Sequence, residues 1–206
     1  MKEPTVFIID DDPSARNGLT NVVRAAGMNV ESFASAKNFL DSKRLEGPGC
    51  IVLDVKMPEI TGPELQEMLI KNDYCMPIIF LSAYGDVPTT ANVFKKGAVD
   101  FLTKPVDRDV LLEAIRHSIT KDAENLLRKE EYHSINQKIN KLTPREHEIM
   151  TYVISGLLNK QIAGRLSISE ETVKIHRGRV MHKLGVVSIT ELVRLCEKVG
   201  ISPVNS

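Results

Sequence analysis

Short apolar runs of strand length recur five times in the first half of this 206-residue chain. Four of these runs lead directly into carboxylate, hydroxyl or ammonium groups, namely Asp10 and Asp11, Asp54, Ser82, and Lys104. Because parallel strands present their carboxyl ends at one edge of a sheet, these groups would converge there if the runs are neighbouring strands. An edge of this composition can hold a hard cation and a phosphoryl group.

Between the apolar runs, residues recur at helical spacing, so that strands and helices alternate. The strand-like runs fall near residues 5–10, 28–33, 50–54, 77–82 and 99–103, and helical patterns cover 14–26, 63–71 and 107–119. Several runs are apolar almost throughout, which is typical of strands buried on both faces of a parallel sheet. Right-handed crossovers then predict a doubly wound α/β domain. We expect its five-stranded parallel sheet to have the strand order 2-1-3-4-5, one of the common orders of this architecture.

Charge is distributed unevenly along the chain, although its formal net charge is zero. Residues 1–117 contain thirteen basic and seventeen acidic residues, whereas residues 141–206 contain ten basic and six acidic ones. The asymmetry favours two domains with different partners, the basic one suited to phosphate backbones; chance variation is the alternative. We therefore expect an α/β domain over residues 1–120, a charged helical linker over 121–140 and an all-α domain over 141–206. A dimer zipper is the alternative reading of the linker.

The chain carries no signal for a membrane or for export. Its longest apolar run is far shorter than the roughly 20 residues that a membrane span needs, and no signal-peptide pattern precedes the first strand. Cys50, Cys75 and Cys196 have neither metal-ligand spacing nor an even count. We therefore expect reduced thiols in a cytoplasmic protein without membrane partners.

The acidic residues would form a pocket at the carboxyl edge of the sheet. In the order 2-1-3-4-5 the first and third strands are neighbours, so Asp10, Asp11 and Asp54 would lie close together. Carboxylates at that distance raise one another's pKa, and a divalent cation such as Mg²⁺, or Mn²⁺ in its place, removes the conflict. Asp54 could then form an aspartyl phosphate, while Lys104 and the Ser82 hydroxyl stabilise the transferring group.

The second half of the chain has the pattern of a four-helix domain. Thr143-Pro144-Arg145-Glu146 is a helix start signal, and helices are expected over about 144–155, 159–166, 170–184 and 188–199. The second and third of these would form a helix-turn-helix. Lysine and arginine side chains on the third can contact phosphates and guanine edges in the major groove: Lys174, Arg177, Arg179 and Lys183. An ordinary solvated basic face is the alternative.

The motifs of the first half resemble the receiver domain of bacterial two-component response regulators. The segments Ile-Ile-Asp-Asp-Asp, Leu-Asp-Val-Lys-Met-Pro, Leu-Ser-Ala and Thr-Lys-Pro carry this resemblance over about residues 4–120. It implies that Asp54 is the phosphoacceptor. It also implies that Asp11, Asp54 and the backbone carbonyl of Lys56 bind Mg²⁺, with Asp10 acting mostly through water.

The same resemblance implies a conformational switch. Ser82 and Phe101 are similar to the family's switch pair, in which the hydroxyl moves toward the phosphate and the aromatic ring rotates inward behind it. The Lys104-Pro105 pair resembles one whose peptide bond is often cis in the family. No residue of the pocket departs from the family's pattern in a way that would prevent phosphorylation.

The second half resembles the LuxR-type helix-turn-helix over about residues 141–200. The segments that carry the resemblance are Leu142-Thr-Pro-Arg-Glu146, Gly156 to Ala163, Ile168 to His176, and Lys183-Leu-Gly. It implies base-facing positions at Lys174 and Ile175 and DNA-backbone contacts at Lys160 and Thr172. The next base-facing position falls on Gly178, so Arg177 or Arg179 would carry part of the recognition. The helix over 188–199 is similar to the family's dimerisation helix, with simple packing as the alternative.

Together the two resemblances imply a response regulator of the FixJ/NarL class, a transcription factor and not an enzyme. A sensor histidine kinase would phosphorylate Asp54, and the chain would then form homodimers, bind promoter DNA and activate transcription by RNA polymerase. Two alternatives remain. Asp10-Asp11-Asp12 also resembles the Asp-x-Asp of haloacid-dehalogenase-type phosphatases, in which Asp10 would be the nucleophile. A DNA-binding protein with a degenerate, phosphate-independent receiver is the other.

Overall fold

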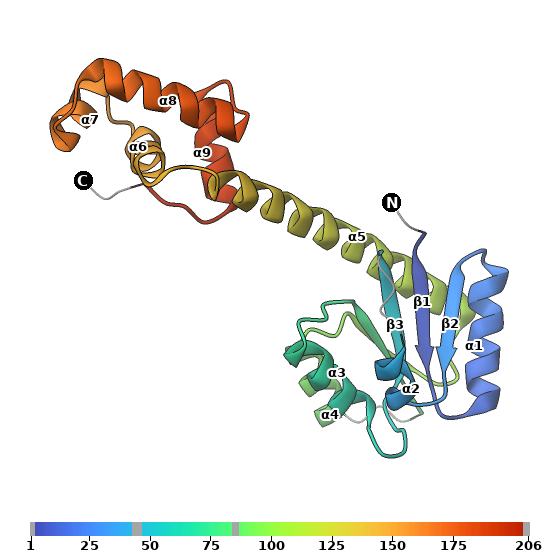
Figure 1. Ribbon diagram of the computed structural model, residues 1–206. Coiled ribbons are helices and arrows are strands. Elements are labelled where there is room, and N and C mark those ends of the chain that lie inside the picture. Colours follow the sequence, from blue (N-terminus) through green and yellow to red (C-terminus); the bar gives the residue numbers. More distant parts are fainter. Residues whose placement is uncertain (1–2, 43–46, 84–86, 204–206) are drawn as a thin grey trace. The chain divides into compact units, whose positions relative to one another are not determined.

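The computed structural model describes residues 3–42, 47–83 and 87–203, drawn as ribbons in Figure 1. The chain divides into two compact units, Met1–Leu126 and Leu127–Ser206. Cys50, Cys75 and Cys196 are free, and only Cys75 is exposed. Among the described residues, no helix is long and apolar enough to cross a membrane.

The first unit is built on a five-stranded parallel sheet with the order β2-β1-β3-β4-β5 (Figure 1). Its strands are β1 (Thr5–Ile9), β2 (Asn29–Phe33), β3 (Gly49–Asp54), β4 (Ile78–Ser82) and β5 (Asp100–Thr103). All residues of β3 and β4 are buried, as expected of central strands covered on both faces. The predicted fold class and strand order are confirmed.

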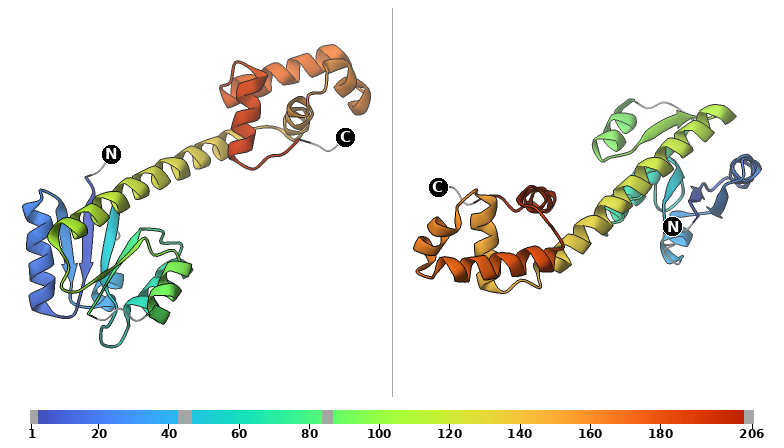
Figure 2. Two further views of the ribbon diagram at one scale, coloured as in Figure 1. Left: turned by 180° about the vertical axis from the view of Figure 1, so that it is seen from behind. Right: turned by 90° about the horizontal axis from the view of Figure 1, so that it is seen from above.

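Helices cover both faces of the sheet (Figures 1 and 2). They are α1 (Pro13–Ala25), α2 (Ala36–Asp41), α3 (Gly62–Lys71), α4 (Val87–Lys95) and the first turns of α5 (Arg108–Ile139). Alternation along β1 divides the core: Val6 and Ile8 pack with residues of α1 and α5, whereas Phe7 and Ile9 pack with residues of α2, α3 and α4. Both faces of the central strands are therefore buried.

Close packing of α3 against β3 shapes the site edge of the sheet. The helix begins with a capping box, in which the Glu64 carboxylate accepts a hydrogen bond from the Thr61 N–H at 2.8 Å. Gly62 lies so near β3 that an added Cβ would fall 2.4 Å from the Asp54 carbonyl oxygen and 3.0 Å from the Phe80 ring. Only glycine allows this approach of helix and strand.

Helix α5 contributes to the hydrophobic cores of both units. Leu111 and Ile115 belong to the core of the first unit, and Ile135 and Ile139 to that of the second. The sequence predicted a helix ending at residue 119 and a separate helical linker, but one helix runs without interruption over Arg108–Ile139. No glycine or proline occurs between these ends to break it.

The second unit adds four helices, α6 (Pro144–Ile154), α7 (Asn159–Leu166), α8 (Glu170–Leu184) and α9 (Ile189–Lys198). Their bounds agree to within one residue with the predicted helices. Ser167 adopts a left-handed conformation in the turn after α7, and Ser169 caps α8 by accepting a hydrogen bond from the Thr172 N–H at 3.1 Å. Leu192 and Cys196 of α9 are fully buried in the core of this unit, so packing accounts for these positions of the helix.

Candidate functional site

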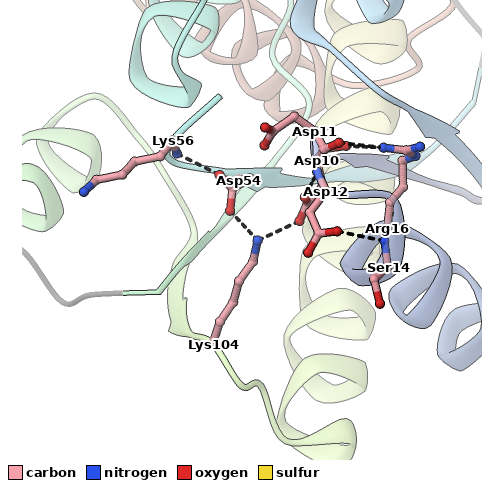
Figure 3. Close-up of polar contacts among 8 residues, drawn as sticks. All are labelled: Asp10, Asp11, Asp12, Ser14, Arg16, Asp54, Lys56 and Lys104. Atoms are coloured by element: carbon pink, nitrogen blue, oxygen red, sulfur yellow. Dashed lines mark hydrogen bonds and ion pairs between the residues drawn. The ribbon is translucent and has the colours of Figure 1, made fainter. Parts of the chain in front are cut away.

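Three side chains from three strand ends meet at the carboxyl edge of the sheet (Figure 3). Asp10 follows β1, Asp54 ends β3, and Lys104 follows β5. The Lys104 ammonium lies 2.7 Å from the Asp10 Oδ2 and also contacts the Asp54 Oδ1. Asp10 and Asp54 are only 1% and 7% exposed, so one ammonium contacts two buried carboxylates and compensates the charge of only one of them. The peptide bond between Lys104 and Pro105 is cis.

The three consecutive aspartates after β1 have different environments. Asp10 is held by the Asp12 N–H, which donates to its Oδ1 at 2.9 Å, and its carbonyl accepts from Arg16 Nη1 at 2.7 Å. Asp12 caps α1 by accepting from the Ser14 N–H at 2.9 Å. The Asp11 side chain is exposed. Of these three side chains, that of Asp11 is therefore the one available to a ligand. Asp10 is held by hydrogen bonds, and Asp12 caps α1.

Asp54 is held on both of its carboxylate oxygens. Its Oδ2 accepts a hydrogen bond from the Lys56 N–H at 2.8 Å, and its Oδ1 contacts Lys104. Burial raises the pKa of Asp54 and the charge of Asp10 acts in the same direction, although the contact with Lys104 opposes both. Burial works against the charge of Lys104, but its contacts with Asp10 and Asp54 outweigh burial and raise the pKa of this ammonium.

The donors at this edge fit a hard divalent cation. The acidic side chains at this edge are those of Asp10, Asp11 and Asp54, and carboxylate oxygens are donors that Mg²⁺ prefers. Within the described parts of the chain, no group of three or more His, Cys, Asp or Glu side chains could hold a metal by itself.

Ser82 and Phe101 lie on the two strands at the far side of Asp54 from β1. Ser82 ends β4 and is buried, and its carbonyl accepts a hydrogen bond from the Lys104 N–H at 2.7 Å. Phe101 is half-buried, and its ring stacks on that of Phe80 with 6.4 Å between centroids. The predicted switch residues are thus linked to the pocket, one by a main-chain bond to Lys104 and the other through the core.

One side of α8 is buried and the other is exposed. Val173, Val180 and Leu184 lie on the buried side, in the core of the second unit. Lys174 and Arg179 are exposed, and Ile175, an apolar residue, is 49% exposed. Lys160, at the start of α7, is exposed too, whereas the Thr172 hydroxyl lies 2.8 Å from the Ser169 hydroxyl.

Arg177 and Lys183, which the sequence placed with the DNA-contacting residues, have partners inside the unit. Arg177 donates to the Asn159 Oδ1 at 3.0 Å. Lys183 lies 2.6 Å from the Glu146 Oε2 and donates to the Lys141 carbonyl at 3.1 Å. The sequence identified Glu146 only as part of the start signal of α6, whereas the structure shows that it also binds Lys183. The hydrogen bond from Lys183, helped by that from the Thr143 N–H, lowers the pKa of Glu146 to about 2.

Comparison with known protein families identifies both units. Residues 6–116 match the response regulator receiver domain, and residues 140–196 match the luxR family of bacterial regulatory proteins. The chain belongs to the response regulators. Receiver domains bind Mg²⁺ at their acidic pocket and take part in signalling with sensor kinases, and LuxR-type domains bind DNA. This family consists of transcription regulators and not of enzymes, so the phosphatase alternative is wrong.

Relatives of this response regulator match it over nearly its whole length. Nodulation protein W of Bradyrhizobium diazoefficiens is 39% identical over 197 residues, covering 96% of this chain and 87% of the relative. Response regulator protein TodT of Pseudomonas putida is 39% identical over 193 residues, covering 94% and 85%. Transcriptional regulatory protein FixJ of Azorhizobium caulinodans is 37% identical over 198 residues, covering 96% and 94%. These relatives place the chain in the FixJ/NarL class.

Solved structures show the same fold. The response regulator StyR matches with a TM-score of 0.87 and 46% identity, covering 96% of this chain and all of that chain. Full-length FixJ from B. japonicum matches with a TM-score of 0.59 and 35% identity, covering 98% of both chains. The predicted combination of an α/β receiver domain and a helical DNA-binding domain is confirmed.

Proposed function

We propose that this response regulator accepts a phosphoryl group on Asp54 from a sensor histidine kinase and that phosphorylation controls promoter binding. The observation that carries this proposal is the contact of the Lys104 ammonium with the carboxylates of both Asp10 and Asp54. It places a nucleophilic oxygen and a fixed positive charge side by side, which is the arrangement that phosphoryl transfer needs.

Each pocket residue has a separate task in the transfer. An Asp54 carboxylate oxygen bonds to phosphorus as the bond between phosphorus and its donor breaks. Lys104 then pairs with a phosphoryl oxygen instead of the carboxylates. Asp11, Asp54 and the Lys56 carbonyl would hold Mg²⁺, with Mn²⁺ as a substitute and Asp10 acting through water. The bound cation would neutralise part of the phosphoryl charge.

The phosphoryl group would be sensed at the ends of β4 and β5. The Ser82 hydroxyl would hydrogen-bond a phosphoryl oxygen, and the Phe101 ring would turn inward behind it. The Lys104 N–H to Ser82 carbonyl bond supports this coupling, because it joins the two strand ends directly at the pocket. Phosphorylation would thereby shift the population of an existing two-state receiver.

The second unit would read DNA with the exposed side of α8. Lys174 and Ile175 would face bases, Arg179 would assist them, and Lys160 and Thr172 would contact the DNA backbone. The phosphorylated chain would form homodimers, bind paired half-sites and activate transcription by RNA polymerase in the cytoplasm. The domains would span residues 1–120 and 141–206, with residues 121–140 of the chain connecting them.

Intact-mass spectrometry tests the phosphorylation step. The full chain is incubated with acetyl phosphate and Mg²⁺, in parallel with Asp54→Asn and Asp10→Asn. We expect a gain of one phosphoryl group that is absent in Asp54→Asn and reduced in Asp10→Asn, because Asp10 supports the pocket but is not the nucleophile. A gain that persists in Asp54→Asn, or no gain with either Mg²⁺ or Mn²⁺, would contradict the proposal.

A further inference from the structure

The last turn of α8 is attached to two other segments of the second unit through one lysine. The Lys183 ammonium lies 2.6 Å from the Oε2 of Glu146, which is in the first turn of α6, and donates to the carbonyl of Lys141, just after the end of α5, at 3.1 Å. The Glu146 side chain is 2% exposed and that of Lys183 is 33% exposed. The lysine therefore reaches inward to a buried carboxylate rather than outward to solvent.

Glu146 is itself fixed by the helix that it caps. Its Oε2 accepts a hydrogen bond from the Thr143 N–H at 2.8 Å, and its own N–H donates to the Thr143 hydroxyl at 3.3 Å. A capping box of this kind sets the direction in which a helix begins. Because one carboxylate serves both the first turn of α6 and the last turn of α8, it fixes the two helices relative to each other.

A second lysine bond joins the same two helix ends, but here the donor belongs to α5 and the acceptor to α8. Lys138, in the last turn of α5, donates to the Leu184 carbonyl at the end of α8 over 3.5 Å. The last carbonyls of a helix have no partner within the helix and attract cations. Ile135 and Ile139 of α5 belong to the same hydrophobic core as Leu184. The end of α8 is thus joined to the end of α5 by apolar packing and by two lysine-to-carbonyl bonds.

We propose that Lys183 is a positioning residue for DNA recognition: through Glu146 and Lys141 it sets the angle of α8, and it does not itself contact DNA. This inference rests on the proposed reading of DNA by α8. Lys174 lies nine residues before Lys183, about 13 Å along the helix axis at 1.5 Å per residue. A small change of helix angle at Lys183 therefore displaces the base-facing side chains.

If Lys183 only positions α8, replacing it should affect DNA binding differently from replacing a residue that contacts phosphate. A residue that contacts phosphate weakens binding to all sequences and lowers the steepness of the salt dependence by about one. A residue that only positions α8 leaves the number of phosphate contacts, and hence the salt dependence, unchanged. Its loss acts on the difference in affinity between matched and unmatched sequences, because base contacts depend on the geometry of the helix.

The test uses the full chain and two labelled duplexes, one selected by the wild-type protein from a randomised pool and one of the same composition with scrambled sequence. Lys183→Met is compared with Lys160→Met, an exposed lysine at the proposed DNA backbone contact. We expect Lys183→Met to lower the ratio of the two affinities on the order of tenfold without changing the salt dependence. Lys160→Met should weaken both duplexes and reduce the salt dependence.

Two further variants separate positioning from a general loss of structure. Lys183→Arg keeps the ion pair with Glu146 and should restore most of the sequence preference. Glu146→Gln should imitate Lys183→Met, and the double variant should be no worse than the stronger single one, since both act through the same contact. If Lys183→Met does not fold, Lys183→Arg and Glu146→Gln still test the contact.

The inference is overturned if Lys183→Met lowers the salt dependence as Lys160→Met does, if the losses from Lys183→Met and Glu146→Gln add, or if Lys183→Met keeps full sequence preference. Failure of the proposed function gives a different result: no duplex is enriched by the wild-type protein, and Lys160→Met and Lys174→Met leave binding unchanged. The two failures can therefore be told apart in one set of titrations.

Discussion

The two units of this response regulator treat charge in opposite ways. In the receiver, two buried carboxylates share one ammonium, and a third, Asp11, is exposed beside them. In the DNA-binding unit, cations are in excess, and two of those on α8, Arg177 and Lys183, bind oxygen atoms inside the unit. The first arrangement leaves negative charge for a cation to neutralise, whereas the second removes positive charge from the surface.

The contrast shows that a count of charges does not identify the residues that bind a ligand. A buried charge without a partner is costly, so inward-facing charges take partners from the fold itself. Lys174 and Arg179 lie on the same helix as Lys183 but are exposed. Which cations remain available to a ligand is therefore decided by burial and by the positions of internal partners.

The largest change in stability is expected where α3 approaches β3 in the receiver. Gly62→Val places a side chain against the Asp54 carbonyl and the Phe80 ring, and should destabilise the first unit by about 3 kcal/mol. In calorimetry of the full chain, the receiver transition should fall by roughly 10 °C while that of the second unit stays in place. Equal stability of the variant and the wild type would contradict the close approach of α3 and β3.

The two capping boxes provide a sharper comparison between the units. Thr61 and Glu64 form one at the exposed start of α3, and Thr143 and Glu146 form the other at the start of α6. Glu146→Gln also weakens the contact with Lys183 and should cost about 1–2 kcal/mol. Glu64 has no ion pair with any residue that the structure describes, so Glu64→Gln should cost less. Urea unfolding of both variants measures the difference, and a larger loss for Glu64→Gln would contradict it.

Much of this architecture follows from the sequence, and what does not depends on contacts between helices. The apolar strands and the helices of the second unit were predictable because continuous apolar runs and a period of 3.6 residues are local patterns. The partner of Lys183 was not, because Glu146 lies 37 residues away and already had a local role as a cap. The two features visible in the sequence were the acidic residue of the helix start signal, Glu146, and the basic end of α8, which carries Lys183. Their pairing depends on how the two helices pack.

Helix α5 shows a second limit of sequence patterns. Its expected end at residue 119 coincides with the last apolar residue that packs in the receiver core, since apolar periodicity reports burial and not helix length. Beyond it, residues 127–134 are all exposed, so no apolar stripe connects them to the receiver helix, although the sequence did predict that they are helical. In the same helix, Val110 is 49% exposed although it neighbours the buried Leu111.

Low pH should remove the contribution of Glu146 to the unfolding free energy of the second unit. Its pKa in the folded chain is about 2, below the ordinary value of 4.5, so its contribution is fully present above pH 4.5 and is lost as the pH falls toward 2. The difference in unfolding free energy between wild type and Glu146→Gln should therefore shrink over this interval. Urea titrations at a series of pH values measure it, and a difference that does not change with pH would exclude this ion pair as its source.

The smallest expected effect is a gain in stability. A Cβ added at Gly178, in the middle of α8, meets no atom within 4 Å, in contrast to Gly62. Gly178→Ala should therefore stabilise the second unit by about 0.5–1 kcal/mol, because alanine loses less backbone freedom in a helix. Gly18→Ala, equally open in α1, is the matched control in the receiver. Slower hydrogen exchange in α8 would report the gain, and faster exchange would contradict it.

The central claim is that phosphorylation of Asp54 controls DNA binding by the second unit. It is tested most directly by titrating a labelled duplex, selected from a randomised pool by the phosphorylated protein, with wild type and Asp54→Asn before and after treatment with acetyl phosphate and Mg²⁺. We predict that treatment raises the affinity of wild type by about 5–150-fold and leaves that of Asp54→Asn unchanged. An equal response of both proteins, or none in wild type that mass spectrometry shows to be phosphorylated, would contradict the claim.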